Sequence, residues 1–243
     1  MSYARDLLAA ELCEATARTL DKIAAERQAA KINERDYLHP ACLSAAREIV
    51  SRREATEVST TVRLESEIWP RLGAVDIGFL ISAEPPVLVE LKAGVGRHAL
   101  VACAWDALKL AFALQTGRAS DAYLLAAAPV ADWAHARGSE FFATRTFESE
   151  ALRETFADGW KTWERDGYPA GSRVPARFAT RALSRTQFIV GAAPWELRLS
   201  AVHVEQPSAW IEWAPLLARP LVDAASQRDE LHEGAVACAS VRQ

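Results

Sequence analysis

The sequence predicts an α/β protein with an α-β-β-β-α-β core and a mixed central sheet flanked by helices. Short apolar or alternating segments bounded by Pro and Gly predict strands, and longer segments with apolar residues at helical spacing predict helices. In chain order these are a helix at 41–54, strands at 58–69, 74–82 and 87–93, a helix at 98–116 and a strand at 121–128. Early links of hairpin length and one late helical crossover predict both antiparallel and parallel pairing.

Further elements are predicted on both sides of this core. A helix over 3–32 precedes it, and 33–40 is expected to be a connection. After Pro129 we expect helical pieces near 131–138 and 147–166, then strands at 187–191, 195–204 and 209–213. The chain is therefore divided into a helical N-terminal extension (1–40), the core (41–130), a C-terminal α+β extension packed on it (131–225) and a polar tail (226–243).

Composition excludes several classes of protein. Half of the 243 residues are hydrophobic and a quarter are charged, which is typical of a globular protein. The four cysteines are scattered and form no CxxC pair, so we expect free thiols and no zinc site. No apolar run approaches the ~18 residues of a membrane helix, and no signal segment is evident, which predicts a cytoplasmic protein without a membrane partner. P-loop, GxGxxG and GxSxG motifs are absent, so no organic cofactor is expected.

Three charged residues on neighbouring predicted strands are the candidates for chemistry. Successive side chains of a strand point to opposite faces, so Asp76 lies opposite Ile77, and Glu90 and Lys92 share a face. If the two strands pair in the simplest register, Asp76, Glu90 and Lys92 meet. The alternative is that Glu90 and Lys92 form a pair on a solvent-exposed strand, with Asp76 merely at a strand end.

These residue types suit phosphate chemistry that depends on a metal ion. An Asp and a Glu supply the hard oxygen ligands that Mg²⁺ prefers, with Mn²⁺ as a substitute, and the Leu91 carbonyl is a further candidate ligand. Lys92 would lie beside the metal and position the attacking water or help to deprotonate it. The sequence thus predicts a metal site formed by Asp76, Glu90 and Leu91.

Val75-Asp76 followed by Val89-Glu90-Leu91-Lys92, in this order of elements, resembles the PD-(D/E)xK nuclease superfamily, whose fold is called restriction-endonuclease-like. The resemblance covers about residues 41–130, and Ala74-Val75 stands where a Pro is expected. It implies that Asp76 and Glu90 bind Mg²⁺ and that Lys92 assists the water. Members often add an acidic residue, for which Glu48 is the first candidate, with Glu65 and Glu67 as alternatives.

The resemblance implies a Mg²⁺-dependent nuclease that hydrolyses phosphodiester bonds, with DNA as the expected substrate, in restriction, repair or phage defence. Cutting both strands of a duplex needs two active sites, which is compatible with a homodimer. The alternative is a non-catalytic nucleic-acid-binding or assembly module that retains the fold. A broken triad would favour that alternative, whereas here all three residues are present.

A second group of residues suggests nucleic-acid binding. Arginines recur every four residues without an acid between them, at Arg173, Arg177, Arg181 and Arg185. A helix from Pro175 would align the last three on one face, where they would bind phosphates. The alternative is a solvated face paired with acids elsewhere, and the net charge of −4 permits only a local basic patch. Lys109, on the predicted helix at 98–116, is a further expected DNA contact, with a simple surface charge as its alternative.

Overall fold

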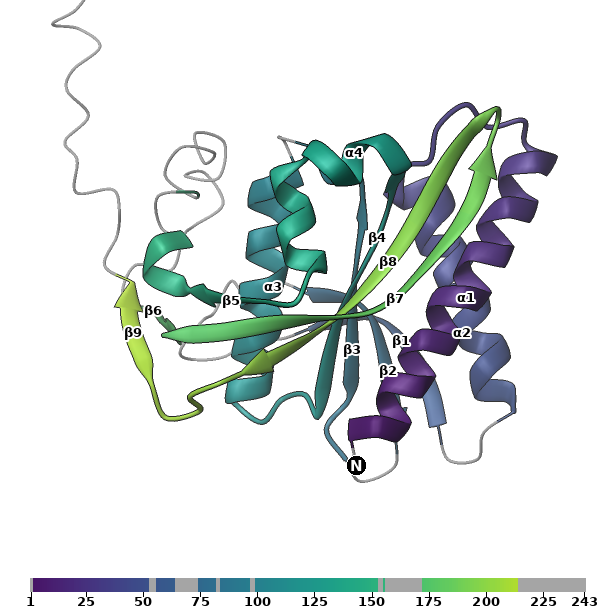
Figure 1. Cartoon of the computed structure of the whole chain (residues 1–243). Helices are drawn as coiled ribbons and strands as arrows, with labels where there is room; N and C mark the ends of the chain where they lie inside the picture. Colours follow the sequence, from purple (N-terminus) through teal and green to yellow (C-terminus); the bar gives the residue numbers. More distant parts are fainter. Residues whose placement is uncertain are drawn as a thin grey trace, which may run out of the picture.

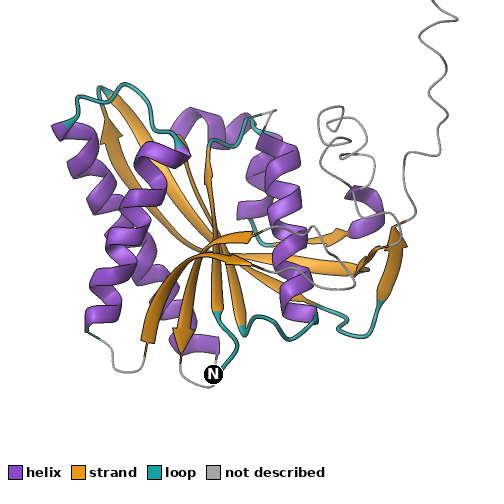
Figure 2. Ribbon diagram, turned by 180° about the vertical axis from the view of Figure 1, so that it is seen from behind, coloured by secondary structure: helices purple, strands orange, loops and turns teal. Residues whose placement is uncertain are grey.

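The structure is a computed structural model that describes residues 2–52, 56–63, 74–81, 84–96, 99–152, 155 and 172–213. The described chain forms a mixed seven-stranded sheet with helices on both faces and a separate two-stranded sheet (Figure 1). Seen from behind, the same layers appear with the sheet between two groups of helices (Figure 2). The predicted α/β class is therefore confirmed.

The N-terminal region is helical, as predicted. It consists of α1 (Ser2–Glu26), a short π-helix η1 (Glu34–Leu38) and α2 (His39–Ser51). The π-helix occupies the segment predicted as a connection, and the Asn33 side chain fixes its start by accepting a hydrogen bond of 2.7 Å from the Asp36 N–H. Pro40 lies in the first turn of α2, where its missing N–H costs no helical hydrogen bond.

The predicted α-β-β-β-α-β order is present in the structure. After α2 come β1 (Thr56–Arg63), β2 (Ala74–Ile81), β3 (Val87–Ala93), α3 (Ala99–Gln115) and β4 (Asp121–Pro129). Gly117, with a φ of 70°, ends α3 in the left-handed conformation that glycine adopts easily. Strands β3 and β4 form the one parallel pair of the described sheet, and α3 is the crossover between them.

The C-terminal part of the chain extends the same sheet. It contains α4 (Val130–His135), the 3-10 helix η2 (Arg137–Phe142), β5 (Arg145–Glu148), β6 (Ser172–Pro175), β7 (Arg177–Val190), β8 (Ala193–Val204) and β9 (Trp210–Trp213). The large sheet has the order β1-β2-β3-β4-β8-β7-β5, and β6 pairs with β9. Because β8 pairs directly with β4, the sheet is continuous across the expected boundary at residue 130.

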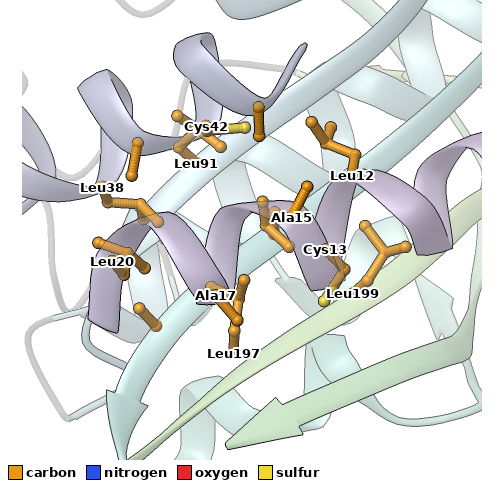
Figure 3. Packing of buried hydrophobic residues seen from close by; sticks show 14 of the residues in the cluster. Leu12, Cys13, Ala15, Ala17, Leu20, Leu38, Cys42, Leu91, Leu197 and Leu199 are labelled. Atoms are coloured by element: carbon orange, nitrogen blue, oxygen red, sulfur yellow. The ribbon is translucent and has the colours of Figure 1, made fainter. Parts of the chain in front are cut away.

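One face of the sheet is covered by α1 and α2, which lie together beside it in Figure 1. Helix α1 packs on two sides within this layer, like a wedge. On one side Leu12 and Ala15 point toward Leu91 and Cys42, and on the opposite side the helix packs on β8 (Figure 3). Fully burying one such leucine stabilises the fold by roughly 1.5–3 kcal/mol. The N-terminal helix is therefore part of the main hydrophobic core.

The other face of the sheet is covered by α3 and η2. Helix α3 is apolar on nearly all sides, and its only charged residues are Asp106 and Lys109. At Gly138 of η2 an added Cβ would lie 2.7 Å from the Val95 carbonyl oxygen, so only glycine permits this close approach to the end of β3. Asp106 and Lys109 are therefore buried between α3 and the sheet.

The predicted helix through 175–185 is wrong, because this segment belongs to strands β6 and β7. The register of β7 against β8 shifts between Ala182 and Ser184, which marks a β-bulge. Phe178 packs on the α3 side and Phe188 on the α1 side, so the bulge exchanges the two faces of the strand. For the helix predicted at 147–166, residues 147 and 148 belong to β5 instead, residues 149–152 and 155 are helical as predicted, and the rest lies outside the described residues.

Two further sequence predictions bear on the fold. No helix in the described ranges is long and apolar enough to cross a membrane. Cys13, Cys42 and Cys103 are free and buried, and burial raises the pKa of each thiol to about 12. Cys238 and the predicted polar tail lie outside the described residues.

Candidate active site

The site lies where β2 and β3 separate. Their antiparallel pairing runs from Phe79 opposite Val87 to Ile77 opposite Val89. Beyond that point a side chain replaces the main chain as the hydrogen-bond acceptor: Asp76 Oδ2 accepts a hydrogen bond of 2.8 Å from the Leu91 N–H. In a strand the N–H and C=O of one residue point the same way, so the Leu91 carbonyl also faces Asp76.

Glu90 and Lys92 project to the α3 side of the sheet, as strand periodicity predicts. Their neighbours Val89 and Leu91 belong to the α1-side core. The Glu90 residue is only 4% exposed, so the alternative of a solvent-exposed strand pair is wrong. Strand periodicity predicts that Val75 and Ile77 share a face, but Val75 packs in the α3-side core and Ile77 packs in the other.

The charged side chains form a row in which signs alternate. Glu90 contacts Lys109, whose Nζ is 3.5 Å from Asp106 Oδ1. The other oxygen of Asp106, Oδ2, lies 3.0 Å from Lys92 Nζ. Lys92 Nζ is in turn 3.4 Å from Glu34 Oε2, on the π-helix that packs against β3. The row thus joins three elements, β3, α3 and η1, from a buried end at Glu90 to a partly exposed end at Glu34.

The alternation fails at one position, where the carboxyl groups of Asp76 and Glu90 adjoin each other. The pKa of Glu90 is raised well above its ordinary value, mainly by burial and by the Asp106 carboxylate. A hydrogen bond to Asp76 raises it further, and the Lys109 ammonium opposes these effects. Burial and the two neighbouring carboxyl groups therefore outweigh the single ammonium group that contacts Glu90.

Lys92 is held in its protonated form. Burial alone would lower its pKa, but the Asp106 and Glu34 carboxylates outweigh burial and raise it. The ammonium group can therefore donate hydrogen bonds and stabilise negative charge, but it is a poor base. Of the two roles predicted for Lys92, the geometry favours positioning over deprotonation of water.

The donor set at Asp76 and Glu90 fits a divalent cation. Four carboxyl groups (Glu34, Asp76, Glu90 and Asp106) and two ammonium groups (Lys92 and Lys109) leave two negative charges when all are ionised. No three His, Cys, Asp or Glu side chains gather as a metal site in the described part of the chain. An ion here would take two carboxylates and the Leu91 carbonyl, with water or substrate completing its shell, which is typical of Mg²⁺.

The predicted fourth acid is placed elsewhere. The Glu48 side chain is 67% exposed on α2 and lies 3.9 Å from Arg52, so it does not join the site. At about 1.5 Å per residue, Glu48 is more than two helical turns from the start of α2, where the chain passes the site. Glu34 takes this place instead, and no sequence signal distinguished it. Glu65 and Glu67 lie outside the described residues.

The predicted DNA contact at Lys109 is also wrong. Its side chain is 7% exposed and points into the protein, where it bonds Glu90 and donates to the Ala74 carbonyl at 2.9 Å. A signal for this arrangement was present in the sequence. Asp106 and Lys109 lie one turn apart as the only charges of a buried helix, and such residues require partners inside the fold.

Most of the predicted arginine row is paired with acids, as its alternative predicted. Arg173 contacts Glu212, Arg177 contacts Glu148 and Glu205, and Arg181 contacts Asp6, at N–O distances of 2.6–3.3 Å. The β-bulge turns Arg185 to the α3 side, away from Arg177 and Arg181. The predicted single face of guanidinium groups therefore does not exist.

Arg185 instead lies directly opposite Arg198 on β8. The Arg198 guanidinium sits 4.4 Å above the Trp133 ring and is 2.5 Å from Glu196. Strand register places Lys92, Ala126, Arg198 and Arg185 in one row across β3, β4, β8 and β7. Three cations thus share one level of the α3 side of the sheet.

The site therefore combines two adjoining carboxyl groups, a protonated lysine beside them and further cations across the sheet. Such an arrangement can hold a divalent ion and stabilise charge on a phosphate. Comparisons of the chain with models of protein families, with curated proteins and with solved structures found no match. Its function is inferred from its own residues alone.

Proposed function

We propose that this protein is a Mg²⁺-dependent nuclease that hydrolyses phosphodiester bonds, with DNA as its substrate. The observation that carries the proposal is the contact between the carboxyl groups of Asp76 and Glu90, which lies beside the protonated Lys92. The two adjoining carboxyl groups have Lys109 as a cationic neighbour in a largely buried site, and a divalent ion would neutralise the negative charge that remains on them.

Each side chain has a defined role in this proposal. Asp76, Glu90 and the Leu91 carbonyl hold the ion. When bound, Mg²⁺ lowers the pKa of water and neutralises charge on the phosphate. Lys92 donates a hydrogen bond that orients the attacking water or a phosphate oxygen. Glu34, 40% exposed beside Lys92, accepts the proton as the water oxygen bonds to phosphorus and the bond to the leaving oxygen breaks.

The cations across the sheet support a polyanionic substrate. Neighbouring strands are about 4.8 Å apart, so Arg198 lies roughly 10 Å and Arg185 roughly 14 Å from Lys92 along the row. Like charges directly opposite each other destabilise a sheet unless something compensates them. Glu196 partly compensates Arg198, and a phosphate of the DNA backbone would compensate Arg185.

A cleavage assay tests the proposal. The parent protein is incubated with supercoiled and linear DNA in Mg²⁺ or in EDTA and compared with Glu90→Gln and Lys92→Met. We expect Mg²⁺-dependent cleavage by the parent and a loss on the order of 100-fold or more in both variants, because each removes charge stabilisation at the reacting phosphate. Glu48→Gln, which neutralises an exposed glutamate away from the site, is the matched control and should cleave like the parent. Equal cleavage by all four proteins would reject the site.

A non-catalytic module that retains the same architecture is the second candidate. One observation favours it: the Lys109 ammonium already contacts Glu90, so this carboxylate is not wholly free for a metal. Calorimetric titration with Mn²⁺ separates the two functions. Heat of binding that disappears in Asp76→Asn supports the nuclease, whereas the absence of carboxylate-dependent binding supports the module.

A further inference from the structure

We propose that Lys109 is a built-in cation that limits this site to one divalent ion and weakens the binding of that ion. The inference rests on the metal site of the proposed function and specifies its stoichiometry. It follows from the oxygen atoms around two side chains of α3, Lys109 and Asp106.

The Lys109 ammonium is bound as a metal ion would be. An ammonium group has three protons to donate, and three oxygen atoms surround this one: Glu90 Oε1, the Ala74 carbonyl oxygen at 2.9 Å and Asp106 Oδ1 at 3.5 Å. The Lys109 side chain is 7% exposed and extends from a buried helix. Its positive charge is therefore a fixed part of the site.

Asp106 is the next carboxylate of the row after Glu90, and both of its oxygen atoms are already engaged. Oδ1 faces Lys109 and Oδ2 faces Lys92 at 3.0 Å. A divalent ion at Asp106 would have to displace an ammonium group and would be repelled by the other. The carboxyl groups of Asp76 and Glu90 adjoin each other, which leaves this edge as the place for the first ion.

The same ammonium must reduce the affinity for the first ion. Glu90 would be shared between the metal and Lys109, so part of its charge is already neutralised. One divalent ion together with the two lysines balances the four carboxylates of the cluster. Removing the Lys109 charge should strengthen binding at the first position and create a second one at Asp106.

Mn²⁺ titration of the full chain, by calorimetry and by electron paramagnetic resonance of free Mn²⁺, tests this inference. We expect one ion per chain in the parent. Lys109→Met, which keeps the length of the side chain without its charge, should bind two ions, the first at least ~10-fold more tightly than the parent. Lys22→Met, which removes a lysine that is 75% exposed on α1, is the matched control and should behave like the parent.

A second variant keeps the test decisive if Lys109→Met does not fold. Lys109→Met combined with Asp106→Asn removes one charge of each sign, so its cluster is less unbalanced than that of the single variant. It should bind one ion, again at least ~10-fold more tightly than the parent. Two ions in the parent, no ion in the parent, or unchanged affinity in both Lys109 variants would overturn the inference.

The two proposals can fail separately. If Mn²⁺ binding changes as expected but no protein cleaves DNA, the nuclease function is rejected and the role of Lys109 stands. If the parent cleaves DNA with two bound ions, the role of Lys109 is rejected and the nuclease function stands.

Discussion

At position 76 we expect the stability of the fold to require only an oxygen acceptor, whereas catalysis should require the carboxylate of Asp76. Its Oδ2 accepts a hydrogen bond of 2.8 Å from the Leu91 N–H, where β2 and β3 no longer pair through their main chains. Asp76→Ala leaves that partly buried N–H without its partner, and losing a hydrogen bond to a charged group costs about 1.5–3 kcal/mol. For a chain of this length this corresponds to a melting temperature lower by roughly 3–12 °C.

Asp76→Asn keeps an oxygen acceptor for the Leu91 N–H and removes the negative charge next to Glu90. We therefore expect its melting temperature in EDTA to stay within about 2 °C of the parent, or to rise. Both variants should lose Mg²⁺-dependent cleavage, because an amide or a methyl group cannot replace a carboxylate ligand. Thermal denaturation followed by circular dichroism, paired with the DNA cleavage assay, measures both effects. An Asn variant that is as unstable as the Ala variant, or that still cleaves, would refute the reasoning.

Three further predictions follow from other contacts. Because burial raises the pKa of Glu90 above its ordinary 4.5, the folded protein binds this proton more tightly than the unfolded chain does. In EDTA the free energy of unfolding should therefore fall as pH rises above 4.5. Urea titrations should show a weaker fall in Glu90→Gln, and an identical fall would contradict the assignment. Gly138→Ala should lower the free energy of unfolding by about 1–3 kcal/mol in the same titrations, because the new methyl group meets the Val95 carbonyl; an unchanged value would mean that η2 can shift. Arg185→Gln should weaken DNA binding in Ca²⁺, measured by fluorescence anisotropy, and reduce the slope of log affinity against log salt concentration by about 1. Arg173→Gln is the control: it removes an arginine already paired with Glu212 and should change the slope much less.

The core of the fold could be predicted because hydrophobic periodicity determines it. Strand β3 alternates between the two cores, so the opposite directions of Leu91 and of the Glu90–Lys92 pair followed from sequence. Strand β2 departs from this pattern, because Val75 and Ile77 pack in different cores. The convergence of Asp76 with the Glu90–Lys92 pair followed from the short link between the strands. What sequence did not reveal is how the strands separate at Asp76, which depends on packing of the whole sheet.

The arginine row shows where periodicity is ambiguous. A spacing of four residues places side chains on one face of a helix and also on one face of a strand. Thr, Phe, Ile and Val residues between 178 and 190 favour a strand, whereas Pro175 is typical of a helix start, and the two indications conflict. The bulge near Ala182 could not be predicted, because nothing local marks the extra residue.

The fourth acid was misplaced for a different reason. Periodicity places Glu48 on the predicted first helix of the core, but it does not tell which end of that helix approaches the sheet edge. In the structure the segment before α2 makes that approach, through a π-helix that brings Glu34 to Lys92. Long-range placement of this kind depends on how α1 and α2 pack together.

The wedge formed by α1 limits how far this chain can be shortened. A fragment that begins at residue 41 would keep Asp76, Glu90 and Lys92 but would uncover the sheet face on which Leu12 and Leu20 pack, and it would lack Glu34. Such a fragment is expected to aggregate through its bare apolar surface before any loss of chemistry could be measured. A shortened protein for biochemical work should therefore retain the first helix, and inactivity of a trimmed core would say nothing about the catalytic residues.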